Sequence, residues 1–254
     1  MPLTVKALQA RGNHLLSLLS DDAHAALTPV LHPVQLDIGH MLHERGKPFS
    51  SDIYFPVTCV LSVILTLRDD AAVEVGSVGN EGFSGVEMLT GAESPFHTYL
   101  CQIPGKAMRM SVADFRQALD TVPGLYRLAL GSLQGFMAHM EQSAACTSQH
   151  AMEARFACWM LLTHDRVEGD DFKLTQEFMA QMLGVHRPSV SLIANRFQQA
   201  GLLRYSGGHV QILDRQGIEA VACECYFDVC NHFQRLPSTV DASDGSSITV
   251  LSAA

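Results

Sequence analysis

The sequence predicts an α+β fold with a β-rich N-terminal domain, a long helix, and a C-terminal unit of two short helices and a hairpin. Short β-prone runs divided by Gly, Pro and Asp fill residues 34–111, and apolar residues near heptad spacing follow over 125–148. Two helical patterns then meet at Gly184 ahead of a two-glycine hairpin. We expect four segments: a β domain with N-terminal helices, a linker with the long helix, a helix-turn-helix domain and an unstructured tail, at residues 1–111, 112–149, 150–236 and 237–254.

Composition limits the functional class. The chain has 254 residues, 47% of them hydrophobic, which is enough for two modest cores. Its net charge of -9 argues against general coating of nucleic acid, although a sequence-specific binder needs only a local basic face. No run is long enough to span a bilayer, and the N-terminus lacks a signal-peptide pattern. We therefore expect a cytoplasmic protein with no membrane partner.

The first part of the chain predicts two short helices and then several strands. Apolar positions at helical spacing over 8–31 are interrupted by a capping cluster at Ser20-Asp21-Asp22. The β-prone runs that follow predict an antiparallel jelly roll or sandwich. They read VQLDIG, IYFPVTCVLSVILTL, AVEVGSVG, HTYLCQIPG and KAMRMS.

The seven cysteines form no obvious framework, because their number is odd and a reducing compartment disfavours disulfides. The only close group is Cys223, Cys225 and Cys230, with His232 as the nearest fourth ligand. This spacing matches none of the common zinc patterns, so we expect half-buried thiols on a terminal helix and no metal site.

A second metal hypothesis concerns His40, His43 and Glu44, because cupin-like enzymes bind a metal through paired histidines and a glutamate on a jelly roll. Residues three apart on a strand point to opposite faces, so His40 and His43 do not suit one ion. No catalytic residues are expected, and a metal-dependent enzyme stays as an alternative only.

Residues 112–148 predict a short helix, a break at Val122-Pro123-Gly124 and a long helix. An apolar stripe of this kind usually packs on its own domain's core. Small residues interleaved in it would also permit close approach of a second helix, and we predict that it forms a parallel dimer seam. The seam residues are Leu125, Leu128, Ser132, Phe136, His139 and Met140.

The segment from Leu174 to Leu203 predicts a helix-turn-helix. Thr175 is a suitable N-cap, Gly184 can adopt the positive φ of the turn, and Pro188 suits the first turn of the second helix. The residues that do not pack are free to enter a major groove. The predicted DNA contacts are Arg187, Ser189, Ser191, Asn195 and Arg196, with Thr175 and His209 at the flanks.

After the second helix, two alternating runs around Gly207-Gly208 predict a hairpin wing. Positive charge is concentrated in this part of an otherwise acidic chain. Five basic residues stand against only Glu177 and Asp214; they are Lys173, Arg187, Arg196, Arg204 and Arg215. Local basic charge beside a helix-turn-helix favours DNA binding.

The span from about Leu174 to Leu213 resembles the C-terminal domain of the Crp/Fnr family of bacterial transcription regulators, in the turn glycine, Arg187, the AGLL exit and the wing. The resemblance implies a homodimer on double-stranded DNA, with the long helix as dimerisation helix. Pro188 and Leu192 stand where cyclic-AMP-responsive members carry Glu and Arg, so we expect a different operator.

The region 31–111 is similar to the cyclic-nucleotide-binding-like domain of that family, through DIG at 37–39, ERG at 44–46 and VGNEGFSGVEMLTG at 78–91. The resemblance implies ligand positions at Gly79, Glu81, Gly82, His97 and Thr98. A His supplies neither permanent charge nor a bidentate fork where the phosphate-binding Arg is expected, so we predict no cyclic AMP binding. The sequence requires no cofactor: the N-terminal cysteine cluster of iron–sulfur relatives is missing, and haem stays open.

The leading hypothesis is therefore a homodimeric, sequence-specific transcription regulator that is not an enzyme. Two alternatives stay open: a metal-dependent enzyme built on the β domain, and a β domain that binds nothing and serves only for dimerisation or contact with RNA polymerase.

Overall fold

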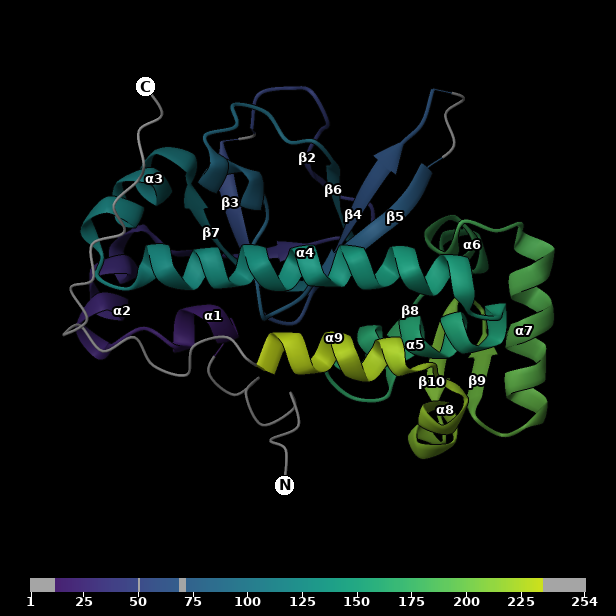
Figure 1. The fold of residues 1–254 in the computed structure, drawn as a ribbon. Helices are drawn as coiled ribbons and strands as arrows, with labels where there is room; N and C mark the ends of the chain where they lie inside the picture. The colour runs from purple at the N-terminus through teal and green to yellow at the C-terminus, as the bar shows by residue number, and fades with distance from the viewer. Residues whose placement is uncertain (1–11, 50, 69–71, 235–254) are drawn as a thin grey trace.

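A computed structural model of the chain describes residues 12–49, 51–68 and 72–234 (Figure 1). The predicted beginning of helical spacing near Leu8 and the predicted tail at 237–254 lie outside the described residues. Among the helices that are described, none combines the length and apolarity needed to cross a bilayer.

Two short helices begin the described chain, as predicted: α1 (His14–Ser17) and α2 (Asp21–Leu27), followed by the 3-10 turn η3 (Thr28–Val30). The Ser20 hydroxyl caps α2 by accepting a hydrogen bond from the Ala23 amide at 3.3 Å. The Asn13 side-chain amide donates to the carbonyls of Pro56 and Gly82, each at 2.9 Å. These bonds attach the N-terminal helices to the β domain.

The β domain consists of two antiparallel sheets. One has the order β1 (His32–Leu36), β7 (Gly105–Ser111), β3 (Asp52–Pro56), and the other β2 (Met41–His43), β6 (Thr98–Ile103), β4 (Val60–Thr66), β5 (Ala72–Val78). Each predicted β run contributes strands, and β2 was not predicted. The rings of Phe55, Phe83 and Phe115 pack between 5.2 and 6.0 Å apart in the core.

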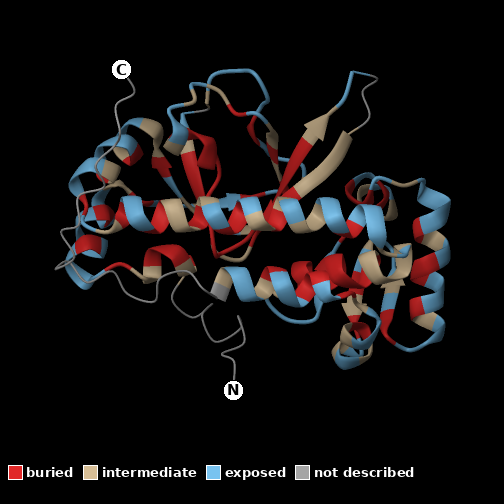
Figure 2. Cartoon of the chain, in the orientation of Figure 1, coloured by how far each residue is buried: buried red, intermediate tan, exposed pale blue. Residues whose placement is uncertain are grey.

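Three helices follow the sheets: α3 (Val112–Thr121), α4 (Leu125–Gln149) and α5 (Met152–His164). Gly124, at φ +81°, turns the chain between α3 and α4 at the predicted break. Helix α4 crosses the whole β domain and continues to the C-terminal domain (Figure 1). Buried and exposed residues alternate along it, so one side faces the chain's own core and the other faces solvent (Figure 2).

The C-terminal domain contains β8 (Asp171–Lys173), α6 (Gln176–Leu183), α7 (Arg187–Gln199), β9 (Leu203–Ser206), β10 (His209–Ile212), α8 (Arg215–Val221) and α9 (Glu224–Gln234). The short strand β8 precedes α6 and pairs with β10. Helix α9 returns beside α4 (Figure 1), where the Phe233 ring packs on Gly135.

The two domains share a packed interface. Helix α6 lies against β5, and the indole N–H of Trp159 donates to the Glu74 carboxylate at 2.8 Å. The Ser62 hydroxyl of β4 lies 2.9 Å from the Met182 sulfur of α6. The apolar core of the C-terminal domain continues into the β domain through Val60 and Ile64. A change in the β4–β5 hairpin can therefore be transmitted directly to the helix-turn-helix.

Candidate nucleic-acid interface

The helix-turn-helix forms as the sequence predicts. The Thr175 hydroxyl caps α6 by accepting from the Phe178 amide at 3.2 Å, and Gly184 ends α6 in the left-handed region at φ +64°. The Val185 amide then donates to the Ala180 carbonyl at 3.0 Å. Buried side chains pack α6 against α7: Met179, Ala180, Leu183, Val190 and Ile193.

Helix α7 presents an exposed face suited to a major groove. Arg187, Ser189 and Asn195 are exposed, and the Leu192 side chain is 55% exposed in their midst. The apolar Leu192 side chain on this polar helix face can contact thymine methyl groups, while an arginine fork can read guanine. Helix α7 lies at the outer edge of the molecule (Figure 1).

Two of the predicted DNA contacts have partners within the chain. The Ser191 hydroxyl is half-buried and donates to the Gln176 side-chain oxygen at 2.7 Å, so it joins α7 to α6. Arg196 is exposed and pairs with the Glu153 carboxylate of α5. An exposed pair contributes only about 0–1 kcal/mol, so a phosphate can replace Glu153 as the partner of Arg196.

The wing is a hairpin of β9 and β10 with Gly207 and Gly208 at its tip, both with positive φ. The Leu174 amide donates to the Gly208 carbonyl at 2.7 Å, which fixes the wing beside the start of α6. The exposed His209 ring lies 3.3 Å from the Asp171 carboxylate. Thr175, His209 and α7 are thus held together as one surface.

Basic charge on this surface is smaller than the sequence suggested. Arg215 is directed inward, where the Asp165 and Glu219 carboxylates hold it at 2.6 and 2.8 Å. Lys173 and Arg204 are exposed on β8 and β9. The Arg204 guanidinium donates to the Gln211 side-chain oxygen at 3.2 Å across the wing.

The predicted nucleotide-binding positions have partners within the chain. Glu81 is 8% exposed, and its carboxylate accepts hydrogen bonds from Arg166 Nε at 3.0 Å and Nη2 at 2.8 Å. A Cβ on Gly79 would lie 2.5 Å from the Arg166 side chain, so this glycine makes room for the arginine. Burial would raise the pKa of Glu81, but the charge and hydrogen bonds of Arg166 lower it overall. Gly82 packs against Val78 and Ser132.

His97 and Thr98 have separate partners. The His97 ring donates to the Glu87 carboxylate at 3.0 Å, and the Thr98 hydroxyl accepts from the Arg45 amide at 3.2 Å. Neither meets Glu81. The ligand set implied by the family resemblance therefore stays a prediction, and in the structure Gly79 and Glu81 pack against Arg166 between the domains.

Most residues of the predicted dimer seam are buried within the chain itself. Leu125, Leu128, Ser132, Phe136 and His139 are at most 4% exposed, because this side of α4 packs on the chain's own core. A Cβ on Gly76 would lie 2.9 Å from the Phe136 ring, so the glycine in β5 admits that ring. Burial lowers the pKa of His139 to about 3, which keeps it neutral. Met140 is half-buried and packs against the core of the β domain.

The three residues of the cupin-like hypothesis do not converge on one point. His43 is buried and hydrogen-bonded to Ser84 at 2.9 Å, whereas Glu44 pairs with Lys47 at 2.7 Å and His40 is exposed. Within the described ranges, the only group of three or more converging histidine, cysteine or acidic ligands lies elsewhere.

The sequence analysis did not identify that group. The thiols of Cys223 and Cys225 lie close to Cys146 and His150. They do not converge with Cys230 and His232, which the sequence analysis considered. Cys230 lies near the Asp165 carboxylate at 3.8 Å, and His232 is exposed. The two missed ligands stand one helical turn apart at the end of α4, a Cys-x-x-x-His spacing that could have indicated them.

Comparisons with known proteins agree with this architecture. Residues 154–221 match the Crp-like helix-turn-helix domain, which here spans α5 to α8. No curated protein sequence matches the chain. Among solved structures, a Crp/Fnr family transcriptional regulator from Eubacterium rectale is 13% identical, with 82% of this chain and 96% of that chain covered and a TM-score of 0.61.

FixK2 from Bradyrhizobium japonicum is 16% identical, with coverages of 76% and 98% and a TM-score of 0.64. A CRP-family transcriptional regulator from Thermus thermophilus is 19% identical, with coverages of 74% and 96% and a TM-score of 0.61. Such structural likeness establishes the fold, and the family match assigns the C-terminal domain. The chain thus has the architecture of a Crp/Fnr-type transcription regulator, with residues 154–221 as its Crp-like helix-turn-helix domain.

Proposed function

We propose that this protein is a homodimer that binds an inverted-repeat DNA site and reads each half-site with the exposed face of α7. The exposed face carries the proposal, because Arg187, Ser189, Leu192 and Asn195 have no packing role in the described structure. Arg187 begins the helix, where its guanidinium can form a bidentate pair with guanine. Ser189 stands beside it and suits a phosphate or base edge.

Substitution of Arg187 tests this assignment. Arg187→Ala is expected to weaken binding to the selected operator by about 5- to 150-fold, which corresponds to about 1–3 kcal/mol for one bidentate base contact. Arg116→Ala is the matched control, because Arg116 is also an exposed arginine and lies on α3 in the other domain. Full affinity and unchanged base preference in the Arg187 variant would rule out its role as a base reader.

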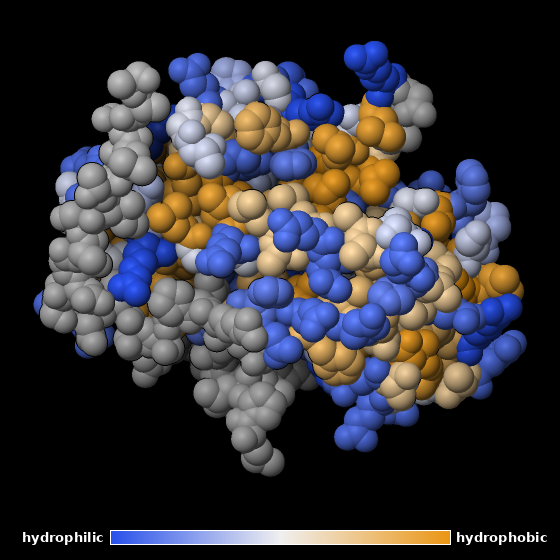
Figure 3. Space-filling model, in the orientation of Figure 1, coloured by the Kyte–Doolittle hydropathy of each residue, from blue (hydrophilic) through white to orange (hydrophobic). Residues whose placement is uncertain are grey.

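The exposed side of α4 supports the dimer. Apolar or small residues recur there at alternating steps of four and three, which is the spacing of a coiled-coil seam. They are Tyr126, Leu130, Leu133, Met137, Met140 and Ala144, here called the outer stripe. Tyr126 is 45% and Met137 48% exposed, so two large side chains of the outer stripe are left uncovered in the single chain. Apolar and polar residues are mixed on the face of the molecule that α4 crosses (Figure 3).

A second copy of this helix is the partner that matches the stripe, because heptad spacing suits another helix of the same register. Exposed polar residues Arg127, Gln134 and Glu141 border it, as expected beside a seam. Met137→Glu is expected to give a monomer by analytical ultracentrifugation, because two glutamates would face each other in the seam. Gln117→Glu adds the same charge to an exposed position of α3 and is expected to leave the dimer intact.

We further propose that the β domain does not bind cyclic AMP. A ribose at Glu81 would have to displace Arg166, which is 4% exposed and donates two charge-assisted hydrogen bonds to that carboxylate. Thermal unfolding with cyclic AMP tests this. A ligand at 100 times its Kd adds about 2.7 kcal/mol of stability, so a binder would raise Tm and this protein is expected to show no shift.

Two side-chain contacts join the domain that would sense a signal to the domain that reads DNA. They are the ion pair of Glu81 with Arg166 and the hydrogen bond of Glu74 with Trp159. A signal that favours separation of these pairs would change the spacing of the two α7 helices in the dimer. Regulation is then a shift between two populated arrangements.

A further inference from the structure

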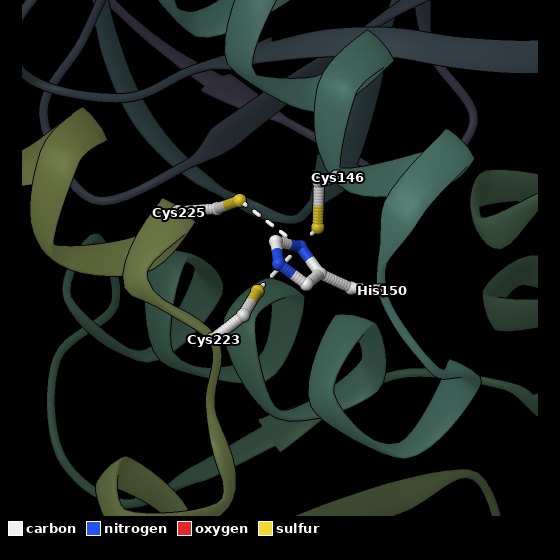
Figure 4. Close-up of side chains that lie close together, drawn as sticks. All are labelled: Cys146, His150, Cys223 and Cys225. Carbon is white, nitrogen blue, oxygen red and sulfur yellow. Dashed lines mark hydrogen bonds between the residues drawn. The ribbon is translucent and has the colours of Figure 1, made fainter.

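Three thiols and one imidazole converge where α4, α5 and α9 meet. They belong to Cys146, His150, Cys223 and Cys225, here called the Cys3His cluster. Cys146 is near the C-terminal end of α4 and His150 caps it, while Cys223 and Cys225 flank the beginning of α9. The four side chains point to a common centre from two distant segments of the chain (Figure 4).

The distances in the cluster suit one tetrahedral ion. Tetrahedral zinc, with bonds of about 2.3 Å to sulfur and 2.0 Å to nitrogen, places sulfur atoms about 3.8 Å apart and sulfur and nitrogen about 3.5 Å apart. Here the sulfurs of Cys146 and Cys223 are 3.5 Å apart, and the Cys225 sulfur is 3.4 Å from His150 Nδ1. All four ligand atoms lie within 4.8 Å of one another.

The groups around the cluster have the arrangement that metal ligands require. His150 turns Nδ1 toward the sulfurs, and its other nitrogen, Nε2, lies 3.3 Å from the Glu224 carboxylate. A carboxylate on the far nitrogen fixes the ring and its tautomer in metal sites. The Gln142 amide donates to the Cys225 sulfur at 3.1 Å, as a donor to a thiolate would.

We propose that one zinc ion binds at the Cys3His cluster, through the sulfurs of Cys146, Cys223 and Cys225 and Nδ1 of His150. Thiolate and imidazole are the ligands zinc takes in structural sites, and four protein ligands leave no open position for substrate. An iron–sulfur cluster does not fit, because its ligands bind different iron atoms and must stand further apart.

A disulfide is the main competing chemistry. The Cys146 and Cys223 sulfurs are 3.5 Å apart, against about 2.05 Å in a disulfide. One disulfide would also leave the third thiol and the imidazole without a common partner, whereas a metal ion engages all four. Cys158 is buried and interacts with the Cys146 and Cys223 sulfurs, but it lies outside the group of mutually close ligand atoms.

The ion would connect the end of the proposed dimer helix to the start of α9. Cys225 and Cys223 are brought to α4 at the point where the chain leaves the winged domain, so the ion would hold that domain against α4. The cluster is independent of the α7 face, and metal binding can be measured whether or not the protein binds DNA.

Metal content of the full-length protein tests the proposal. Protein purified under reducing conditions without chelator is expected to contain about one zinc per chain by inductively coupled plasma mass spectrometry. The Cys225→Ser variant is expected to contain none. Cys101→Ser, which removes a buried thiol of the β domain, and Cys158→Ser are expected to retain it. After chelation, cobalt(II) is expected to bind with the visible bands of a tetrahedral thiolate complex.

The exposed carboxylate gives a test that does not endanger folding. Glu224→Ala is expected to weaken zinc binding by about 10- to 100-fold, as loss of a supporting carboxylate does elsewhere. Asp228→Ala, one turn further along α9 and also exposed, is the control. Absence of zinc together with no cobalt bands would overturn the proposal, as would iron as the native metal or a disulfide between cluster cysteines in protein kept reduced.

Discussion

Removal of Arg166 is the sharpest test of how the two domains are joined. Its guanidinium is buried and makes two hydrogen bonds to Glu81, one to the Ser77 hydroxyl at 3.0 Å and one to the Leu162 carbonyl at 3.3 Å. Arg166→Met removes all of them and leaves the Glu81 carboxylate buried without a counter-charge. Breaking one side of a buried ion pair costs about 3–5 kcal/mol, so we expect a loss of stability in that range.

Denaturant unfolding followed by fluorescence is the assay, because Trp159 is the sole tryptophan and lies at the domain interface. Glu81→Gln and the double variant complete a double-mutant cycle, in which the double variant is expected to be more stable than Arg166→Met alone. Arg109→Met breaks the exposed pair with Asp52 and is expected to cost only about 0–1 kcal/mol. If Arg166→Met and Arg109→Met lowered the free energy of unfolding equally and only slightly, the buried pair would not be what joins the domains.

Three further changes have defined outcomes. Burial raises the pKa of Glu74 from 4.5 to about 7. The contribution of Glu74 to stability is therefore full below pH 4.5 and is lost as pH rises through 7. Glu74→Gln is expected to flatten the plot of Tm against pH in that window, and an unchanged plot would contradict this account. Phe136→Ala is expected to cost about 3–5 kcal/mol in chemical unfolding, whereas Phe96→Ala, which removes a ring that is 61% exposed in the β domain, should cost far less. Gly184→Ala is expected to cost about 1–2 kcal/mol because φ is +64° there, although a Cβ would meet nothing closer than 3.8 Å; a neutral result would show that the turn can relax.

Local signals predicted the helix-turn-helix because the residues that define it act within a few positions of each other. Thr175 caps the helix that it precedes, and Gly184 supplies the turn between adjacent helices. The strands were predicted for the same reason, since alternation and turn residues are local. The short β2 was missed because only its pairing with β6 makes it a strand.

Contacts between distant residues could not be predicted from local patterns. Helix α4 has apolar residues on two sides, and spacing alone could not tell that Phe136 faces the core and Met137 faces solvent. Glu81 matched a ligand pattern, but its partner Arg166 lies 85 positions away. Cys146 and Cys223 are 77 positions apart, so only the fold brings them together.

Selection of bound duplexes from a random-sequence DNA pool, with full-length protein at near-physiological salt, tests the central claim most directly. We predict an enriched inverted repeat whose half-sites are centred about 10–10.5 base pairs, or a small multiple of that, apart, because two α7 helices related by a dimer axis must enter major grooves on one side of the duplex. Enrichment of no sequence, with or without cyclic nucleotides and cell extract, would contradict a dimeric regulator that reads DNA through α7.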